Sequence, residues 1–453
     1  MNKSNLTSAP EGNPSSLKRR YAIVGTGGRA WMFIQALAET YRDGCDLVAF
    51  CDLNQTRMNY YNRALADTFG VAPVPTYLAK DFDRMVGDAQ PDVVIVSTID
   101  RTHHLYIIRA MELGRDVITE KPLTIDVEKC GAILDAVERT GRKLTVTFNY
   151  RYAPIRARVK ELLIADSIGE VKSIHFEWLL DTNHGADYFR RWHREKRNSG
   201  GLMVHKATHH FDLVNWWLDT APETVFAVGS LAFYGKANAL RRGVKKFYDR
   251  GTDSDEAKRD PFALDLRQSE TLKGLYLEAE HEDGYRRDLS VWSDGITIED
   301  TMNVLVRYKS GAQMSYSLHA YAPWEGYRVA FNGTKGRIEL NHQESSYINA
   351  RDGSLSEGVS SSEQILLLPH FEKPRIVEIP QGRGGHGGGD PIMLEDIFGT
   401  RKDADPLKRA ANHLDGARSL LTGIAANRAF ETGLPVHVDD LLPRAARASA
   451  ENG

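Results

Sequence analysis

The sequence predicts an α/β protein whose first part is a doubly wound parallel sheet. Three observations support this fold class. The chain has 453 residues, enough for two domains that each bury a core. Its N-terminal third alternates short apolar runs with helical patterns. A glycine-rich turn joins the first apolar run to the first helical pattern.

The composition is that of an ordinary globular protein and argues against several partners. Hydrophobic residues make up 42% of the chain, charged residues 26%, and the formal net charge is -3. A nucleic acid or a membrane surface as main partner would favour a basic patch, so neither is expected. The three cysteines have no metal-ligand spacing, and no apolar run is long enough to span a bilayer. We expect a cytoplasmic protein.

The domain boundaries follow from shifts in composition. Residues 1–17 are rich in Ser, Asn, Pro and Gly and predict a disordered tail, because they lack the apolar stretch of a signal peptide. We expect a dinucleotide-binding domain over residues 18–149 and a second α/β domain over residues 150–453.

The glycine-rich turn carries a dinucleotide fingerprint. Arg20–Val24 reads as a strand, GTGGRA follows, and Trp31–Tyr41 has helical periodicity. Glycines allow the backbone to approach a pyrophosphate, whose charge is favoured at a helix N-terminus. The cofactor-binding candidates of this turn are Gly25, Gly27, Gly28, Arg29 and Ala30.

An acidic residue follows the second strand. Asp46–Phe50 reads as that strand, and Asp52 lies where a carboxylate would accept hydrogen bonds from the adenosine ribose. A carboxylate there repels a 2′-phosphate, and no arginine directly follows it, so NAD is favoured over NADP. A helix-capping aspartate is the alternative interpretation.

Polar residues follow the later strands of this sheet. Pro91–Ser97, the stretch starting at Asp116 and Lys143–Phe148 read as buried parallel strands. Ligands bind at the carboxyl ends of such strands, so these ends predict further cofactor contacts. The candidates are Ser97, His103, Glu120 and Lys121, with Asn149 close by.

The stretch Ser199–Trp217 (SGGLMVHKATHHFDLVNWW) concentrates titratable groups beside apolar ones. As one helix it would place His205 and His209 one turn apart on one face, with Asp212 a further turn along. These groups could handle protons or, by their helical spacing, bind a metal ion. Histidines packed and hydrogen-bonded in a core are the remaining alternative.

A polar and aromatic segment, 181–198, precedes this stretch. It is either a solvated charged loop or a loop that faces the substrate. Its cations and aromatic rings would suit a sugar, including an anionic one, through stacking and charge-assisted hydrogen bonds. The substrate-binding candidates are Arg151, Tyr188, Arg190, Trp192, Lys206 and Asp212.

The remaining chain predicts strands and irregular segments. Gly169–Leu180, Thr301–Tyr308 and Ala312–His319 alternate like sheet strands, and a charged insertion over 235–289 is expected to cap the sheet. The glycine-rich run 382–389 contains His386 and precedes an expected helix, Pro391–Phe398. It is either a flexible loop or brings a third imidazole into the site.

The chain resembles the Gfo/Idh/MocA family, which includes glucose–fructose oxidoreductase and inositol dehydrogenase. GTGGRA with Asp52, the tripeptide Glu120–Lys121–Pro122 and the glycine–histidine–acid stretch carry the resemblance. It implies a Rossmann domain followed by an α/β domain with a large, mostly antiparallel sheet. It also implies a lysine near the nicotinamide at Lys121, a cis bond before Pro122, and a homodimer or homotetramer.

One position departs from the family pattern. The family usually has an aspartate where this chain has His205, whereas His209 and Asp212 match its later histidine and aspartate. The loop around His386 is similar to loops of family relatives that cleave glycosides with bound NAD.

These features predict NAD-dependent oxidation of a carbohydrate hydroxyl, with Lys121, His205, His209 and His386 as the catalytic candidates and no metal ion. An NAD-using glycosidase, which belongs to a second class of enzyme, is the alternative. It would oxidise the sugar at C3, eliminate the group at C1 and re-reduce the ring, on an anionic glycoside such as a sulfoquinovoside or a uronide. A protein that only binds NAD is a third possibility.

Overall fold

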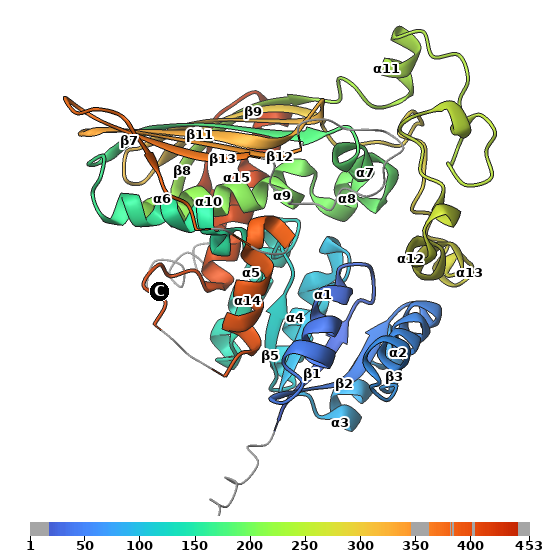
Figure 1. The fold of residues 1–453 in the computed structure, drawn as a ribbon. Helices are drawn as coiled ribbons and strands as arrows, with labels where there is room; N and C mark the ends of the chain where they lie inside the picture. The colour runs from blue at the N-terminus through green and yellow to red at the C-terminus, as the bar shows by residue number, and fades with distance from the viewer. Residues whose placement is uncertain (1–17, 346–361, 381, 383–384, 401–403, 443–453) are drawn as a thin grey trace, which may run out of the picture.

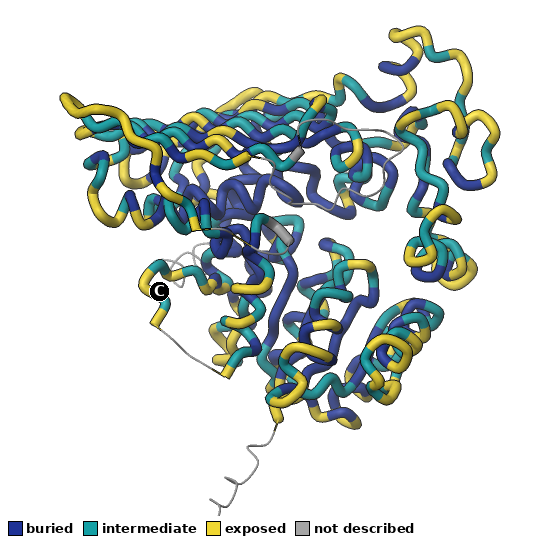
Figure 2. Tube along the Cα trace, in the orientation of Figure 1, coloured by how far each residue is buried: buried dark blue, intermediate teal, exposed yellow. Residues whose placement is uncertain are grey.

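The computed structural model describes residues 18–345, 362–380, 382, 385–400 and 404–442. Two sheets organise them (Figure 1). A large sheet lies at the top of the view, a smaller one lies below, and a layer of helices fills the space between them. This layer contains the most buried segments of the chain (Figure 2).

The smaller sheet is doubly wound and has the order β15-β6-β5-β4-β1-β2-β3. Six strands are parallel, and β1, β4 and β5 at the centre of the sheet are mostly buried, as the continuous apolar runs predict. The seventh, β15, pairs antiparallel with β6 and comes from the C-terminal part of the chain. The strands are β1 (Arg19–Val24), β2 (Cys45–Asp52), β3 (Thr76–Leu78), β4 (Val93–Val96), β5 (Asp116–Thr119), β6 (Leu144–Val146) and β15 (Ala411–Asn412).

Local signals start and stop the helices that cover this sheet. Asn54 and Asp126 accept hydrogen bonds from backbone N–H groups at the first turns of α2 and α5. Gly70 and Gly141 end the same helices in the left-handed region. The helices are α1 (Ala30–Gln35), which continues as the π-helical turn η1 (Ala36–Thr40), α2 (Gln55–Phe69), α3 (Phe82–Ala89), α4 (His103–Glu112) and α5 (Val127–Thr140).

The larger sheet has nine strands in the order β14-β13-β12-β11-β7-β10-β9-β8-β16. Every pairing in it is antiparallel except that between β7 and β10. The strands are β7 (Val171–Asp181), β8 (Pro222–Ser230), β9 (Thr301–Tyr308), β10 (Gln313–Ala322), β11 (Glu325–Gly333), β12 (Gly336–Ser345), β13 (Ser362–Pro369), β14 (Arg375–Val377) and β16 (Val436–His437). The mostly antiparallel sheet that the resemblance implies is therefore present.

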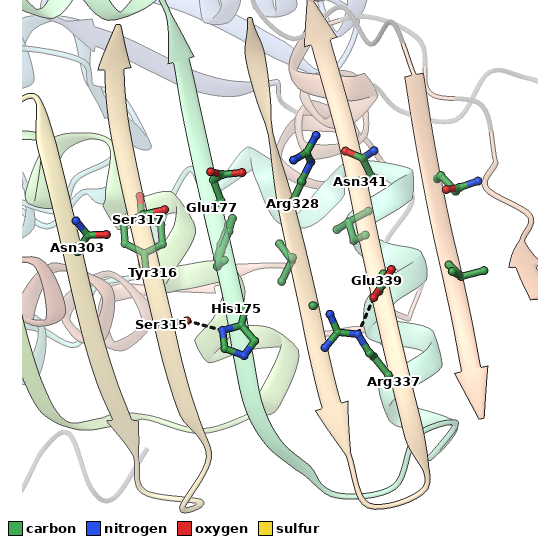
Figure 3. A pocket seen from close by; sticks show the side chains of 16 residues that line it. His175, Glu177, Asn303, Ser315, Tyr316, Ser317, Arg328, Arg337, Glu339 and Asn341 are labelled. Carbon is green, nitrogen blue, oxygen red and sulfur yellow. Dashed lines mark hydrogen bonds and ion pairs between the residues drawn. The ribbon is translucent and has the colours of Figure 1, made fainter. Parts of the chain in front are cut away.

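The two faces of the larger sheet differ. Its inner face packs on helices through large side chains such as Trp178 and Phe331. Trp217 of α10 meets Phe331 edge to face, with ring centroids 5.3 Å apart. Each such aromatic ring contributes about 1.5–3 kcal/mol by burial. Its outer face carries polar side chains around a hollow of about 590 Å³ (Figure 3). The helices against the inner face are α6 (Pro154–Ile164), α9 (Leu202–His205), α10 (Ala207–Leu218) and α15 (His413–Thr432).

Three segments differ from the sequence-based expectation. The stretch Ser199–Trp217 forms two helices, α9 and α10, which meet at Lys206. The segment 181–198 is half buried and mostly helical, forming α7 (His184–Arg190) and α8 (Lys196–Ser199). The last helix before β15, α14, begins at Gly385 and so includes most of the glycine-rich run.

A buried ion pair holds the segment that follows the first sheet against the second domain. Arg151, in the turn η4 (Asn149–Tyr152) that follows β6, donates two hydrogen bonds to the carboxylate of Asp212 on α10, at 2.8 Å from Nε and 2.5 Å from Nη2. Both side chains are at most 3% exposed. Together with β15, this pair fixes the second domain against the edge of the first sheet. Among the described residues, no helix combines the length and apolar character needed to cross a membrane.

We expect Arg151→Met to destabilise the fold by about 3–5 kcal/mol, because it leaves the Asp212 carboxylate buried without its cation. Denaturant unfolding measures the change. Arg158→Met, which removes an exposed pair with Glu161, is the matched control and should cost under about 0.5 kcal/mol. The double variant Arg151→Met/Asp212→Leu should recover most of the loss, and equal losses in the single and double variants would contradict the pairing argument.

Candidate functional site

A cavity of about 710 Å³ lies between the two domains. One wall comes from the carboxyl ends of β1, β2, β4 and β5, and the other from α7, α9, α10 and the insertion after β8. The hollow on the outer face of the larger sheet shares no lining residue with it. The cavity therefore lies where a doubly wound sheet binds its ligand.

The glycine turn between β1 and α1 forms one end of the cavity. Gly25 has a φ of +90°, and a Cβ there would lie 2.6 Å from the carbonyl carbon of Ser97. Only glycine fits this position, which brings the turn against the end of β4. Gly27, Gly28 and Arg29 line the cavity after it, whereas Ala30 is buried at the start of α1.

Asp52 lies at the end of β2 and also lines this part of the cavity. Its carboxylate accepts hydrogen bonds from Thr26 Oγ1 at 2.9 Å, from the Thr26 N–H and from the Asn54 N–H at 2.9 Å. Burial raises the pKa of Asp52, and the hydrogen bonds from Thr26 oppose this rise. A carboxylate has about four acceptor sites, so capacity remains for a ribose hydroxyl.

The insertion closes over this end of the cavity, which the expectation of a cap on the sheet did not foresee. Its second half, with α12 (Glu270–Leu272), η8 (Lys273–Leu277) and α13 (Glu280–Asp283), lies beside α2 in Figure 1. We call this segment, 270–287, the strap. The Gly28 N–H donates to the hydroxyl of Tyr276 at 2.8 Å, so the strap contacts the glycine turn itself.

Further contacts hold the strap on the first domain. The carboxylate of Glu282 accepts from the backbone N–H groups of Gln55 and Thr56, at the N-terminus of α2. Asp283 pairs with Arg57 at 2.7 Å, and Arg57 Nη1 lies 3.9 Å from Asp52. The strap and the first domain thus form one enclosure around Asp52.

The ends of β4 and β5 supply the next group of residues. The Lys121–Pro122 bond is cis, as the resemblance implies. The ring nitrogens of His103 lie 2.9 Å from the Pro122 carbonyl and 3.1 Å from the Thr98 carbonyl, which ties the two strand ends together. Glu120 accepts from Arg29 at 2.8 Å. The hydroxyl of Ser97 donates to the Gly25 carbonyl at 2.7 Å.

His205 meets a carboxylate from the other domain. Its Nδ1 lies 2.5 Å from Oδ2 of Asp100, which follows β4, and both side chains are nearly buried. Lys121 Nζ donates to the backbone carbonyl of His205 at 3.2 Å. An acid, an imidazole and an ammonium thus meet at one point of the cavity wall.

Burial sets the protonation of this pair. It raises the pKa of the Asp100 carboxyl well above its usual range, although Lys121 opposes the rise. It lowers the pKa of the His205 imidazole well below its usual range, and the positive charge of Lys121 acts in the same direction. The two groups titrate as a unit and share a proton across a short contact. His205 Nε2 is the nitrogen left for a substrate.

Aromatic rings form the wall next to His205. The Tyr188 ring lies 5.5 Å from the His205 ring, and the His193 ring lies 4.2 Å from it. Trp192 stacks on His193 with centroids 3.5 Å apart. Such a wall can pack against the apolar face of a sugar ring, while its imidazoles and phenol reach polar groups.

Cations face the same space. Lys206, at the break between α9 and α10, is 2% exposed, and its Nζ donates to the Tyr150 hydroxyl at 3.0 Å. His209 stacks on the Tyr150 ring with centroids 4.1 Å apart. Arg191 lines the cavity beside Tyr188. Lys121, Lys206 and Arg191 bring positive charge to this end of the cavity, and Arg191 also pairs with Asp187 at 3.1 Å.

Several sequence candidates lie elsewhere. Arg151 and Asp212 bind each other inside the domain contact and do not line the cavity. Arg190 is buried and donates to the Phe262 and Asn183 carbonyls, away from the cavity. The side chain of His386 lies outside the described residues.

Several residues of the wall were not among the sequence candidates. Asp100, His184, Arg191, His193 and Tyr276 are examples that line the cavity. A signal existed for Asp100, since it follows a buried strand as a ligand-binding residue would. Among the described residues, no three His, Cys, Asp or Glu side chains are grouped as metal ligands.

Comparison with known proteins identifies both halves of the chain. A model of the Gfo/Idh/MocA oxidoreductase family's NAD-binding Rossmann fold matches residues 19–148. A model of the same family's C-terminal alpha/beta domain matches residues 160–438. The glycine turn, the free acceptor capacity of Asp52 and the enclosure by the strap fit the NAD that the first match implies.

Similar proteins extend over nearly the whole chain. YteT of Bacillus subtilis, which is named as an oxidoreductase, is 37% identical over 94% of this chain and 99% of its own length. Glycosyl hydrolase family 109 protein 2 of Akkermansia muciniphila is 23% identical over 93% of this chain and 82% of its own length. The solved structure of an aldose–aldose oxidoreductase from Caulobacter crescentus has a TM-score of 0.60 and 19% identity, and the match covers 93% of this chain and 99% of that one.

We expect Glu282→Ala to speed the release of NADH about tenfold, because the strap then loses charge-assisted hydrogen bonds to α2. Stopped-flow displacement of NADH, read by its fluorescence, measures this rate. Glu278→Ala, an exposed change in the same segment, is the matched control. Equal release rates in both variants would show that the strap does not retain the cofactor.

Proposed function

Because the chain belongs to the Gfo/Idh/MocA oxidoreductase family, we propose that it oxidises a ring hydroxyl of a carbohydrate with NAD as hydride acceptor. The observation that carries this proposal is the Asp100–His205 pair beside Lys121, on the wall of the cavity that begins at the glycine turn. This is a proton-transfer group next to a dinucleotide site, which is the combination that alcohol oxidation requires.

We assign a separate role in the reaction to each residue of this wall. His205 Nε2 accepts the hydroxyl proton, and the Asp100 carboxylate stabilises the imidazolium that results. Lys121 donates a hydrogen bond to the substrate oxygen as negative charge develops on it. Bound NAD supplies the acceptor for the hydride. Asp100 thereby provides the carboxylate that the family usually carries at the position of His205.

The substrate class follows from the same wall. Tyr188 and Trp192 offer faces for a sugar ring, and Lys206 and Arg191 offer positive charge for a carboxylate or sulfonate. We therefore propose an anionic sugar, such as a uronate, as the preferred substrate. His209 lies on the same side of the cavity and completes its polar lining.

A redox-neutral glycosidase is the second candidate. The similarity to a glycosyl hydrolase family 109 protein over 93% of this chain favours it. In that reaction the sugar is oxidised at C3, loses its C2 proton, expels the group at C1, and is re-reduced after water adds. Both candidates begin with the same hydroxyl oxidation at Asp100–His205.

A substrate panel separates the two candidates. Glucuronate, galacturonate, glucose, galactose and myo-inositol, each free and as a 4-nitrophenyl glycoside where one exists, are incubated with excess and with trace NAD. The dehydrogenase predicts steady NADH formation from a free uronate and no aglycone release. Aglycone release without net NADH supports the glycosidase instead, and equal rates with neutral and anionic sugars would contradict the charge argument.

The pH dependence tests the Asp100–His205 pair. Oxidation needs the pair with one proton between the Asp100 carboxylate and Nδ1 of His205 and none on Nε2. The raised pKa of Asp100 places the loss of the second proton well above the ordinary carboxyl range. The kcat/KM for oxidation should therefore rise with pH, and that for reduction of the ketone should fall over the same interval. Asp100→Asn should lower kcat/KM for oxidation about 10²–10⁴-fold and abolish its rise with pH. An oxidation rate that falls as pH rises would contradict the assignment.

A further inference from the structure

A second chain of hydrogen bonds reaches the cavity from the opposite side of His205. The hydroxyl of Tyr188 lies 3.0 Å from Nε2 of His184, and Nδ1 of His184 lies 2.7 Å from Oε1 of Glu325. Tyr188 and His184 line the cavity, whereas Glu325 is 4% exposed behind them. A phenol, an imidazole and a buried carboxylate are thus connected in series.

The backbone holds this series in place. The second carboxylate oxygen of Glu325 accepts from the Asp181 N–H at 3.0 Å, and Asp181 Oδ1 accepts from the His184 N–H at 2.8 Å. At Gly185 a Cβ would lie 1.9 Å from the Ala320 carbonyl oxygen, so only glycine allows α7 to pack this closely on β10. His184 and Tyr188 are one helical turn apart on α7, and both are fixed against the larger sheet.

This series is separate from the Asp100–His205 pair. The two sets share no hydrogen bond among those described, yet the Tyr188 and His205 rings are 5.5 Å apart. Removing the proton of one hydroxyl requires one acceptor, and His205, paired with the Asp100 carboxyl, provides it. A second connected acceptor at this distance can act on a different atom of the same sugar.

We propose that Tyr188, His184 and Glu325 form a second proton relay, which removes the proton from the sugar carbon next to the newly oxidised one. The proposal rests on the proposed function, because that carbon becomes acidic only once its neighbour is a ketone. It deepens the assignment by making Tyr188 a catalytic residue and His184 and Glu325 its positioning residues.

The proton transfers of this step involve only the sugar, Tyr188 and His184. The C–H bond breaks and its proton goes to the Tyr188 oxygen, while the phenolic proton of Tyr188 passes to His184 Nε2. The electron pair of the broken bond stays on the sugar as an enolate conjugated with the new carbonyl. Glu325 carries a negative charge against the imidazolium. A phenol, with a pKa of about 10, gives a stronger conjugate base for a weak carbon acid than imidazole does.

Solvent deuterium exchange tests the relay with the intact NAD-bound protein. The probe is the panel sugar that reduces NAD fastest, incubated in D₂O and recovered for NMR and mass spectrometry. We expect the wild type to place deuterium on the carbon adjacent to the oxidised one. Tyr188→Phe should slow this exchange at least about 100-fold more than it slows single-turnover NADH formation in the same sample.

Two further variants make the result specific. His184→Gln should slow exchange by a smaller factor than Tyr188→Phe, because the phenol remains without its proton acceptor. Tyr321→Phe, which removes a hydroxyl bonded to Thr301 away from the cavity, is the matched control and should exchange like the wild type. Thermal unfolding shows that each variant is folded.

The outcomes separate the relay from the proposed function. If no panel sugar reduces NAD, the proposed function fails and the relay fails with it. If the wild type forms NADH without deuterium exchange, or if Tyr188→Phe exchanges normally, the relay alone is overturned. If Tyr188→Phe loses exchange and NADH formation to the same extent, Tyr188 acts in hydroxyl oxidation or substrate binding, and the relay is likewise overturned.

Discussion

The contact between His205 and Asp100 is the interaction on which the candidate site depends. Asp100 follows a strand of the first sheet and His205 ends a helix of the second domain, so a 2.5 Å contact requires the two domains to be held in register. Neither group is favourable alone in that position, because burying an unpaired carboxylate or imidazolium costs several kcal/mol. As a pair they share a proton, and burial favours the neutral forms of both.

Other contacts in the fold hold the two domains in this relative position. Arg151 and Asp212, which the sequence suggested for substrate binding, instead form the buried ion pair between the strand end after β6 and α10. β15 adds to the first sheet from the far end of the chain. The strap closes the other side through Glu282 and Tyr276. Contacts on three sides therefore hold the cavity walls at a fixed separation.

The sequence predicts the elements better than it predicts the contacts between them. Thr301–Tyr308 has the same bounds as a predicted strand and as β9, because its apolar residues alternate with polar ones. The fingerprint glycines and Lys121 also lie where their motifs indicate. Asp100 was missed as a partner of His205 because 105 residues separate them, and no local pattern encodes a contact between domains. The break at Lys206 was missed for a similar reason, since tertiary packing overrides a continuous helical pattern.

The two proton-handling sets differ in what they depend on. The Asp100–His205 pair exists only when both domains are assembled, so the hydroxyl oxidation proposed for it depends on the contact between the domains. Tyr188, His184 and Glu325 all belong to the second domain and are fixed by α7 on the larger sheet. A change at the domain contact should therefore disturb the geometry of the Asp100–His205 pair and leave that of Tyr188, His184 and Glu325 in place. In the two proposals, the step after oxidation thus depends on groups held on the larger sheet, and the oxidation depends on the contact between the domains.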